Sequence, residues 1–104
     1  MNKILNLYSL SLDYPDVSGA EVLELLAIRD QIANLELELS LKEQKILFEA
    51  DKKLIANASS FYLEISRFIN LYEHRKNNNI SPQKWWWYLD VLRNIHNYLI
   101  PVAA

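Results

Sequence analysis

The 104-residue chain carries a net charge of −2, with 51% hydrophobic residues and no cysteine. This length suits one domain and is too short for two, and the apolar content argues against a disordered chain. Without cysteine there is no disulfide, thiolate metal site or cysteine nucleophile, and one glycine with three prolines is too few for the many turns of a β-sandwich or barrel. We therefore predict a single all-α domain over residues 1–104.

The amino-terminal segment lacks the apolar core and cleavage site of a signal peptide, and no apolar run approaches the ~20 residues that cross a bilayer. We expect a cytoplasmic protein with no membrane partner. Charge is uneven, because residues 1–51 carry four basic and ten acidic side chains, whereas residues 52–104 carry seven basic and three acidic. This polarity fits an ordinary solvated surface, and it also suits head-to-tail association or an acidic partner for the carboxy-terminal half.

The first segment, residues 1–17, is an apolar arm whose conformation the sequence leaves open. Tyr8, Leu10 and Leu12 alternate as in a strand, whereas Leu5 and Tyr8 have helical spacing. Both an extended arm and a short helical arm fit this pattern.

A first helix is predicted over residues 19–39, because Ser18 and Glu21 form a capping box at its start. Within it, the alternating leucines of residues 35–41 also fit a strand, but Leu and Glu are good helix formers and Glu is poor in strands. A second capping box begins at Ser40, so the chain either breaks there or continues as helix. The apolar stripe of this helix recurs every three or four positions: Leu25, Ile28, Ile32, Leu35 and Leu39.

Apolar residues at intervals of seven predict a long helix over residues 41–76. This stripe is wider than the seam of a two-stranded coiled coil, so the helix is expected to touch more than one neighbour. A last helix is predicted over residues 82–100, from the Ser81–Pro82 N-cap to Pro101. The two series in the long helix are Leu41, Phe48, Ile55, Tyr62 and Ile69, and Leu47, Leu54, Phe61 and Phe68.

The predicted helices differ too much in length for either shorter one to cover the long one. At ~1.5 Å per residue the 41–76 helix would be about 54 Å long, roughly twice the length of either shorter helix. If the shorter helices pack antiparallel against its two halves, part of the wide stripe stays uncovered. We therefore expect a helical hairpin or bundle that forms a homodimer or a larger assembly.

Three adjacent tryptophans open the predicted last helix. Because successive helical residues lie ~100° apart, the three cannot share a face. Trp85 and Trp87 are predicted in the core, whereas Trp86 falls on the polar face, where a Trp is typical of an interface hot spot and needs something to cover it. The predicted partner-binding set joins this face to the basic residues near the hairpin tip: Trp86, Asp90, Arg93, Asn97, Arg75, Lys76 and Lys84.

Basic side chains beside aromatic rings also suit single-stranded nucleic acid. The stretch Arg93-Asn94-Ile95-His96-Asn97-Tyr98 resembles the motif of HEPN-type helical ribonucleases, in which an Arg and a His act on the scissile phosphate. The resemblance covers one or two helical turns and implies such roles for Arg93 and His96, although their spacing is two residues shorter than in that motif. Arg67 and His74 give a looser match.

The sequence contains no glycine-rich phosphate loop, hydrolase triad or ExxH pattern of a di-iron bundle. We therefore assign no catalytic residue, metal ligand or cofactor. The favoured function is a non-enzymatic module for protein–protein interaction or assembly, such as an adaptor, which associates with itself and presents an aromatic and basic helix face to another protein. The alternatives are a nucleic-acid-associated helical protein, with or without ribonuclease activity, and a structural subunit of a larger complex.

Overall fold

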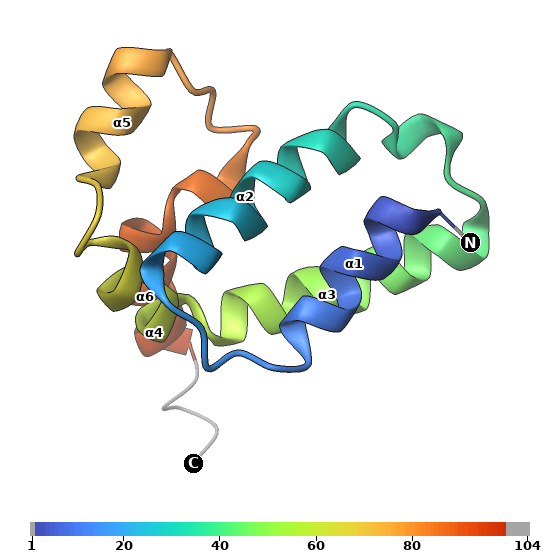
Figure 1. The fold of residues 1–104 in the computed structure, drawn as a ribbon, viewed down its shortest axis with the longest axis horizontal. Helices are drawn as coiled ribbons and strands as arrows, with labels where there is room; N and C mark the ends of the chain where they lie inside the picture. Colours follow the sequence, from blue (N-terminus) through green and yellow to red (C-terminus); the bar gives the residue numbers. More distant parts are fainter. Residues whose placement is uncertain (1, 100–104) are drawn as a thin grey trace.

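The computed structural model describes residues 2–99, and for residues 96–99 it describes the backbone alone. Over these residues the predicted all-helical class is confirmed, with six α-helices, two 3₁₀ helices and no strand (Figure 1). The radius of gyration is 13.7 Å, close to the ~13 Å of a compact domain of this length. The elements are α1 (Lys3–Leu12), α2 (Gly19–Ala33), η1 (Glu36–Glu38), α3 (Leu41–Ala56), α4 (Ala58–Ile65), α5 (Leu71–Asn78), η2 (Trp85–Trp87) and α6 (Leu89–Leu99).

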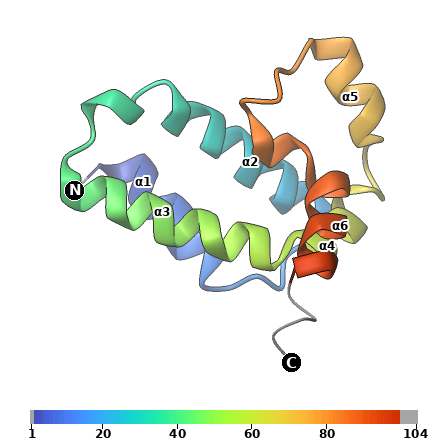
Figure 2. The ribbon, with the colours of Figure 1, turned by 180° about the vertical axis from the view of Figure 1, so that it is seen from behind.

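Helix α2 is the element around which the others are arranged. It contacts α1, α4 and η2, while α1 also packs on α3 and α4 packs on α6. Figure 2 shows α1 and α3 running side by side, with α6 next to α4. Helix α5 stands at the edge of the molecule, joined to it by Leu71, which is buried.

The amino-terminal arm is helical. Asn2 caps α1, because its side-chain oxygen accepts hydrogen bonds from the amides of Ile4 at 2.8 Å and Leu5 at 3.1 Å. Leu5, Tyr8 and Leu12 lie three and four residues apart and are all buried. The sequence allowed an extended arm or a short helical arm, and the structure has the helical one.

Both capping boxes are present and start helices where the sequence places them. Ser18 and Glu21 cap α2, and Ser40 and Glu43 cap α3. The first helix, however, ends at Ala33 rather than at residue 39, and η1 forms the turn to α3. An unbroken helix would place Leu37 and Leu39 on opposite faces. With the helix broken, Leu39 is buried in the core and Leu37 is fully exposed to solvent.

In place of the single helix expected over residues 41–76, the structure has three. Asn57 separates α3 from α4, and its side-chain amide donates to the Lys53 carbonyl oxygen at 2.8 Å. Asn70 caps α5 by accepting from the Glu73 amide at 3.0 Å. Asparagine side chains compete for helical backbone groups, which favours helix ends at these two positions. Leu54 of α3 and Phe61 of α4 are both buried in the core.

The last helix begins at Leu89 rather than at residue 82. Helix α5 ends at Asn78, and the next residue, Asn79, has φ 51° and ψ 47° and so provides the left-handed cap that glycine often supplies. The tryptophans then form η2, and Tyr88, with φ −114° and ψ 43°, separates them from α6. An α-helix would point Trp86 and Trp87 in different directions, whereas here both are buried against α2.

Gly19, the one glycine of the chain, lies where α2 meets α4. A Cβ atom on Gly19 would lie 2.2 Å from the main-chain oxygen of Glu64 and 2.4 Å from Cδ2 of Phe68. Both distances are far below van der Waals contact, and a backbone oxygen inside a helix cannot swing aside as a side chain does. Gly19 is therefore required by the close approach of two helices, and its φ angle is not positive.

We predict that Gly19→Ala destabilises the fold by about 1–3 kcal/mol, the cost of overpacking a close contact. The direction of the stability change distinguishes a close contact from an open site, because Gly→Ala at an unstrained helical site stabilises by ~0.4–1 kcal/mol. Urea unfolding followed by circular dichroism measures the change. The neighbouring Ala20 is exposed, so Ala20→Ser is the control and should shift stability by less than ~0.5 kcal/mol. A more stable Gly19→Ala protein would contradict this packing.

Candidate functional site

Trp86 is not a surface anchor. Its side chain is 3% exposed, and that of Trp87 is 4% exposed. The two indole nitrogens donate to the same oxygen, Oδ1 of Asp30 on α2, at 2.8 and 2.9 Å. The prediction of an exposed Trp86 was wrong because it assumed α-helical angles in a segment that forms η2. Trp87 is in the core as predicted, and Trp85 is half-buried, with its ring edge-on to that of Trp86.

A buried guanidinium lies beneath these rings. Arg29 of α2 is 3% exposed, and its carbon Cζ is 4.3 Å from the centre of the Trp86 ring, within cation–π range. Its Nε and Nη2 donate to the two carboxylate oxygens of Asp51 on α3 at 3.0 and 3.1 Å. The Tyr8 hydroxyl of α1 donates to Oδ1 of Asp51 at 2.7 Å. Nη1 lies 2.8 Å from Oε1 of Glu36, an ion-pair contact without the alignment of a hydrogen bond.

The charge states of this Arg29 cluster (Tyr8, Arg29, Glu36, Asp51 and Trp86) follow from burial and pairing. Burial disfavours the guanidinium charge, but Asp51 and Glu36 more than offset this and raise the pKa of Arg29. Burial and Asp51 raise the pKa of Tyr8, so its hydroxyl stays protonated. Burial also raises the pKa of Asp51, against the effect of Arg29. Three converging hydrogen bonds favour the carboxylate, so the pair is ionic at neutral pH.

A second ion pair joins two residues of the predicted partner-binding set. Arg75 of α5 donates to both carboxylate oxygens of Asp90 on α6 at 2.6 and 3.0 Å, and to the Trp87 carbonyl oxygen at 3.1 Å. Burial works against ionisation of Asp90, but Arg75 outweighs it and holds the pKa of Asp90 below its usual value. The pair therefore fixes α5 to the start of α6.

The other members of the predicted set are spread over the surface. Lys76 is exposed, and the Lys84 ammonium is 3.9 Å from Oδ1 of Asp30. The Arg93 guanidinium lies 4.8 Å from the centre of the Tyr62 ring. The side chain of Asn97 lies outside the described residues. The structure thus brings Arg75 and Asp90 together but does not assemble the whole set into one site.

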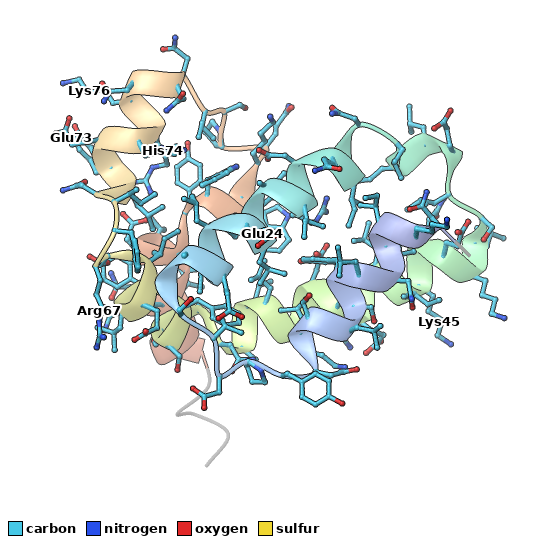
Figure 3. The ribbon with its side chains drawn as sticks, in the orientation of Figure 1. Glu24, Lys45, Arg67, Glu73, His74 and Lys76 are labelled. Carbon is cyan, nitrogen blue, oxygen red and sulfur yellow. The ribbon has the colours of Figure 1, made fainter. Side chains whose placement is uncertain are left out.

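The residues of the ribonuclease resemblance are used in local packing where they are described. The His74 ring lies 4.8 Å from that of Trp87, and Arg67 pairs with Glu64 at 3.5 Å (Figure 3). The side chain of His96 lies outside the described residues, so the structure does not show where it lies relative to Arg93.

The most exposed apolar surface lies at η1 and α3, on residues that the sequence analysis placed in no site. Leu37 is 101% exposed, Leu41 is 85% exposed and Phe48 is 60% exposed; we call these three side chains the α3 face. Leu37 and Phe48 line a groove of about 360 Å³ whose wall includes Arg29 and Asp51. In the sequence, the seven-residue apolar series that starts with Leu41 and Phe48 is the feature that could have indicated this surface.

Residues 2–99 contain neither a cluster of metal-ligating side chains nor a membrane-spanning helix. No group of three or more His, Asp or Glu side chains there is placed to hold a metal ion. The helices described are also too short or too polar to cross a bilayer. Comparison with known protein families, curated proteins and solved structures finds no significant match to this chain. Its function must be inferred from the geometry.

We predict that Arg29→Met costs about 3 kcal/mol or more, because it leaves the Asp51 carboxylate buried without its partner. Replacing the whole polar network with apolar groups, as in Tyr8→Phe/Arg29→Met/Asp51→Leu, should cost less than the single change. Urea unfolding of the two variants measures both quantities. A triple variant less stable than the single one would show that the ion pair itself, and not the orphaned charge, carries the energy.

We also predict that Asp90→Asn lowers stability by about 1 kcal/mol at pH 7, a modest value because the pair is partly exposed. The folded-state pKa of Asp90 is below the unfolded value of ~3.9, so the stabilisation is present above about pH 4 and is lost as pH falls through the folded pKa. Urea unfolding at pH 7 and pH 3 should show the difference between wild type and variant shrinking at low pH. A constant difference would contradict the ion-pair explanation.

Proposed function

We propose that this protein is a non-enzymatic interaction module that self-associates through the α3 face. The observation that carries the proposal is the exposure of Leu37, Leu41 and Phe48 on η1 and α3, where Leu37 and Phe48 also line a groove. Large apolar side chains gathered at one place on a surface mark interaction sites, whereas scattered ones do not. The cysteine-free composition suits a reducing compartment, so we place the module in the cytoplasm.

The energy available on the α3 face suits a reversible dimer. Burying one Leu or Phe side chain gains about 1.5–3 kcal/mol. In a two-fold dimer each of the three side chains counts twice, which gives roughly 9–18 kcal/mol before the ~4–15 kcal/mol cost of association. Pairing the low ends of the two ranges leaves about 5 kcal/mol and pairing the high ends leaves about 3 kcal/mol, which corresponds to dissociation constants of roughly 0.1–10 mM. Association should therefore depend on protein concentration.

Charged side chains flank this face without covering it. Lys52 lies with its ammonium 4.9 Å from the centre of the Phe48 ring, and it also pairs with Glu49 at 3.3 Å. Lys45, between Leu41 and Phe48 on α3, is exposed and extends away from the helix (Figure 3). An apolar centre with a polar rim is the usual arrangement of a protein–protein interface.

The nucleic-acid alternative has less support. It requires free basic groups beside stacking platforms, but Arg75 is paired with Asp90 and the Trp86 ring is buried. Stacking of bases needs exposed ring faces, and a neutralised guanidinium adds little attraction for phosphate. Binding of single-stranded RNA at low salt, abolished by raising the salt, would favour this alternative over the interaction module.

We predict that Leu41→Glu weakens self-association at least about a hundred-fold, because a two-fold dimer loses the side chain from both protomers, the equivalent of ~3–6 kcal/mol. Glutamate is favourable in the first turn of a helix, so the monomer should stay folded. Sedimentation velocity over a dilution series from micromolar to millimolar measures the effect. Leu63→Glu is the matched control, because Leu63 is 56% exposed on α4 and outside the α3 face; it should associate like wild type.

A second experiment locates the interface directly. Because the chain has no native cysteine, Lys45→Cys introduces a single thiol on the α3 face, and Ser60→Cys introduces one at an exposed position of α4. A short bis-maleimide should cross-link the first variant into dimers and leave the second mostly monomeric. A wild-type protein that stays monomeric at millimolar concentration, or equal cross-linking of both variants, would overturn the proposal.

A further inference from the structure

We propose that a second surface, the groove between α1 and α2, binds a basic amphipathic helix of a different protein. Residues from three consecutive segments line it: Leu7 and Ser11 on α1, Tyr14 and Val17 in the connection, and Glu21, Glu24, Leu25 and Ile28 on α2. None of these residues lines the groove at the α3 face. We call this second surface the acidic groove.

The dimensions of the acidic groove suit side chains of a helix. Its volume is about 230 Å³, below the ~300–1,000 Å³ of pockets that enclose whole drug-sized molecules. Along α2, the lining from Glu21 to Ile28 spans about two helical turns, or roughly 10 Å at 1.5 Å per residue. A bound helix that places apolar side chains at positions i, i+3 or i+4, and i+7 covers the same length.

The lining offers apolar contact that the free protein leaves exposed. Leu25 and Ile28 form a buried floor, with 5% and 8% exposure. Leu7 is 48% exposed and Tyr14 is 74% exposed, so each still shows much of its surface to solvent. A Tyr whose ring stands at the edge of an apolar groove can cover the side of a bound helix while its hydroxyl stays in water.

The negative charge of the acidic groove favours a basic partner. The groove itself carries Glu21 and Glu24, and residues 13–24 include four acidic side chains and no Lys or Arg. Of these acids, Asp13 is paired with Lys53, while Glu24 extends from α2 at an exposed position (Figure 3). Lys or Arg side chains beside the apolar stripe of a bound helix would meet these carboxylates. The same charges oppose binding of nucleic acid or anionic lipid.

The described part of this chain offers no good occupant from a second copy. Helix α5 is eight residues long and presents one exposed apolar side chain, Tyr72, beside one exposed cation, Lys76. Helix α6 presents Val91 and Ile95, but the one Lys or Arg among its described side chains, Arg93, is half-buried. A helix with three apolar anchors and flanking cations is thus the partner of a different protein.

The test uses the full chain and a synthetic probe. The probe is a fluorescein-labelled 18-residue helical peptide that combines a leucine stripe with lysines, and the comparison peptide replaces every lysine with glutamate. We expect fluorescence anisotropy to show saturable binding of the lysine peptide, weakened several-fold between 50 and 300 mM salt, and little binding of the glutamate peptide. Equal binding of the two peptides, or no binding of either, would overturn the proposal.

Matched variants separate the acidic groove from general electrostatic attraction. Glu24→Lys should weaken binding of the lysine peptide at least ten-fold. Glu38→Lys makes the same charge change at an exposed position of η1 and should leave the binding affinity nearly unchanged. Tyr14→Ser tests the apolar contribution without changing charge and should also weaken binding. Circular dichroism checks that each variant folds. Equal effects of Glu24→Lys and Glu38→Lys would show nonspecific attraction and sink the proposal.

Binding of the lysine peptide to the acidic groove should not depend on the α3 face. Leu41→Glu should bind the lysine peptide like wild type, because Leu41 does not line the acidic groove. Loss of peptide binding in that variant, with the fold intact, would place the peptide at the α3 face and overturn the assignment to the acidic groove.

Discussion

The ion pair between Arg29 and Asp51 is the contact on which the arrangement of the helices depends. It joins α2 to α3 directly, reaches α1 through the Tyr8 hydroxyl, and approaches η1 and η2 through Glu36 and the Trp86 ring. A buried ion pair adds little net stability over apolar packing, but breaking it is costly. An alternative packing that separates α2 from α3 would leave a charge buried and unpaired. The pair therefore selects one arrangement among the many that an apolar core of this size would tolerate.

Because the tryptophans are used inside this arrangement, the exposed apolar side chains lie elsewhere. The α3 face is an apolar surface on an outward side of α3 and η1, whereas the acidic groove combines apolar walls with carboxylates. The first suits contact between like surfaces and the second suits an oppositely charged partner. If both proposals hold, the protein associates with itself through the α3 face and holds a different protein in the acidic groove.

The sequence predicted those features that local chemistry determines. The helical class follows from composition and periodicity, and the starts of α2 and α3 follow from two capping boxes that satisfy backbone amides within four residues. The breaks at Asn57 and Asn70 were missed, because asparagine is also tolerated inside helices and the apolar period of seven continues across Asn57 and up to Ile69, next to Asn70.

The candidate sites were harder to predict because they depend on contacts that are distant in sequence. Arg29 and Asp51 are 22 residues apart and Trp86 lies 56 residues from Asp30, so no spacing rule connects them. The position of Trp86 was derived from a regular α-helix, and a 3₁₀ turn of three residues was enough to turn it inward. The width of the apolar stripe did indicate surplus apolar surface on α3, but the acidic groove needs α1 as a helix, which the sequence left open.

The burial of the tryptophans against α2 also determines what the protein's own ultraviolet emission reports. All three indoles stand within one short segment; those of Trp86 and Trp87 are hydrogen-bonded to Asp30, and the Arg29 guanidinium lies against the Trp86 ring. Their fluorescence therefore reports mainly on the packing of η2 against α2. Far-ultraviolet dichroism averages over every helix, so the two signals would separate if the carboxy-terminal third detached before the remainder melted.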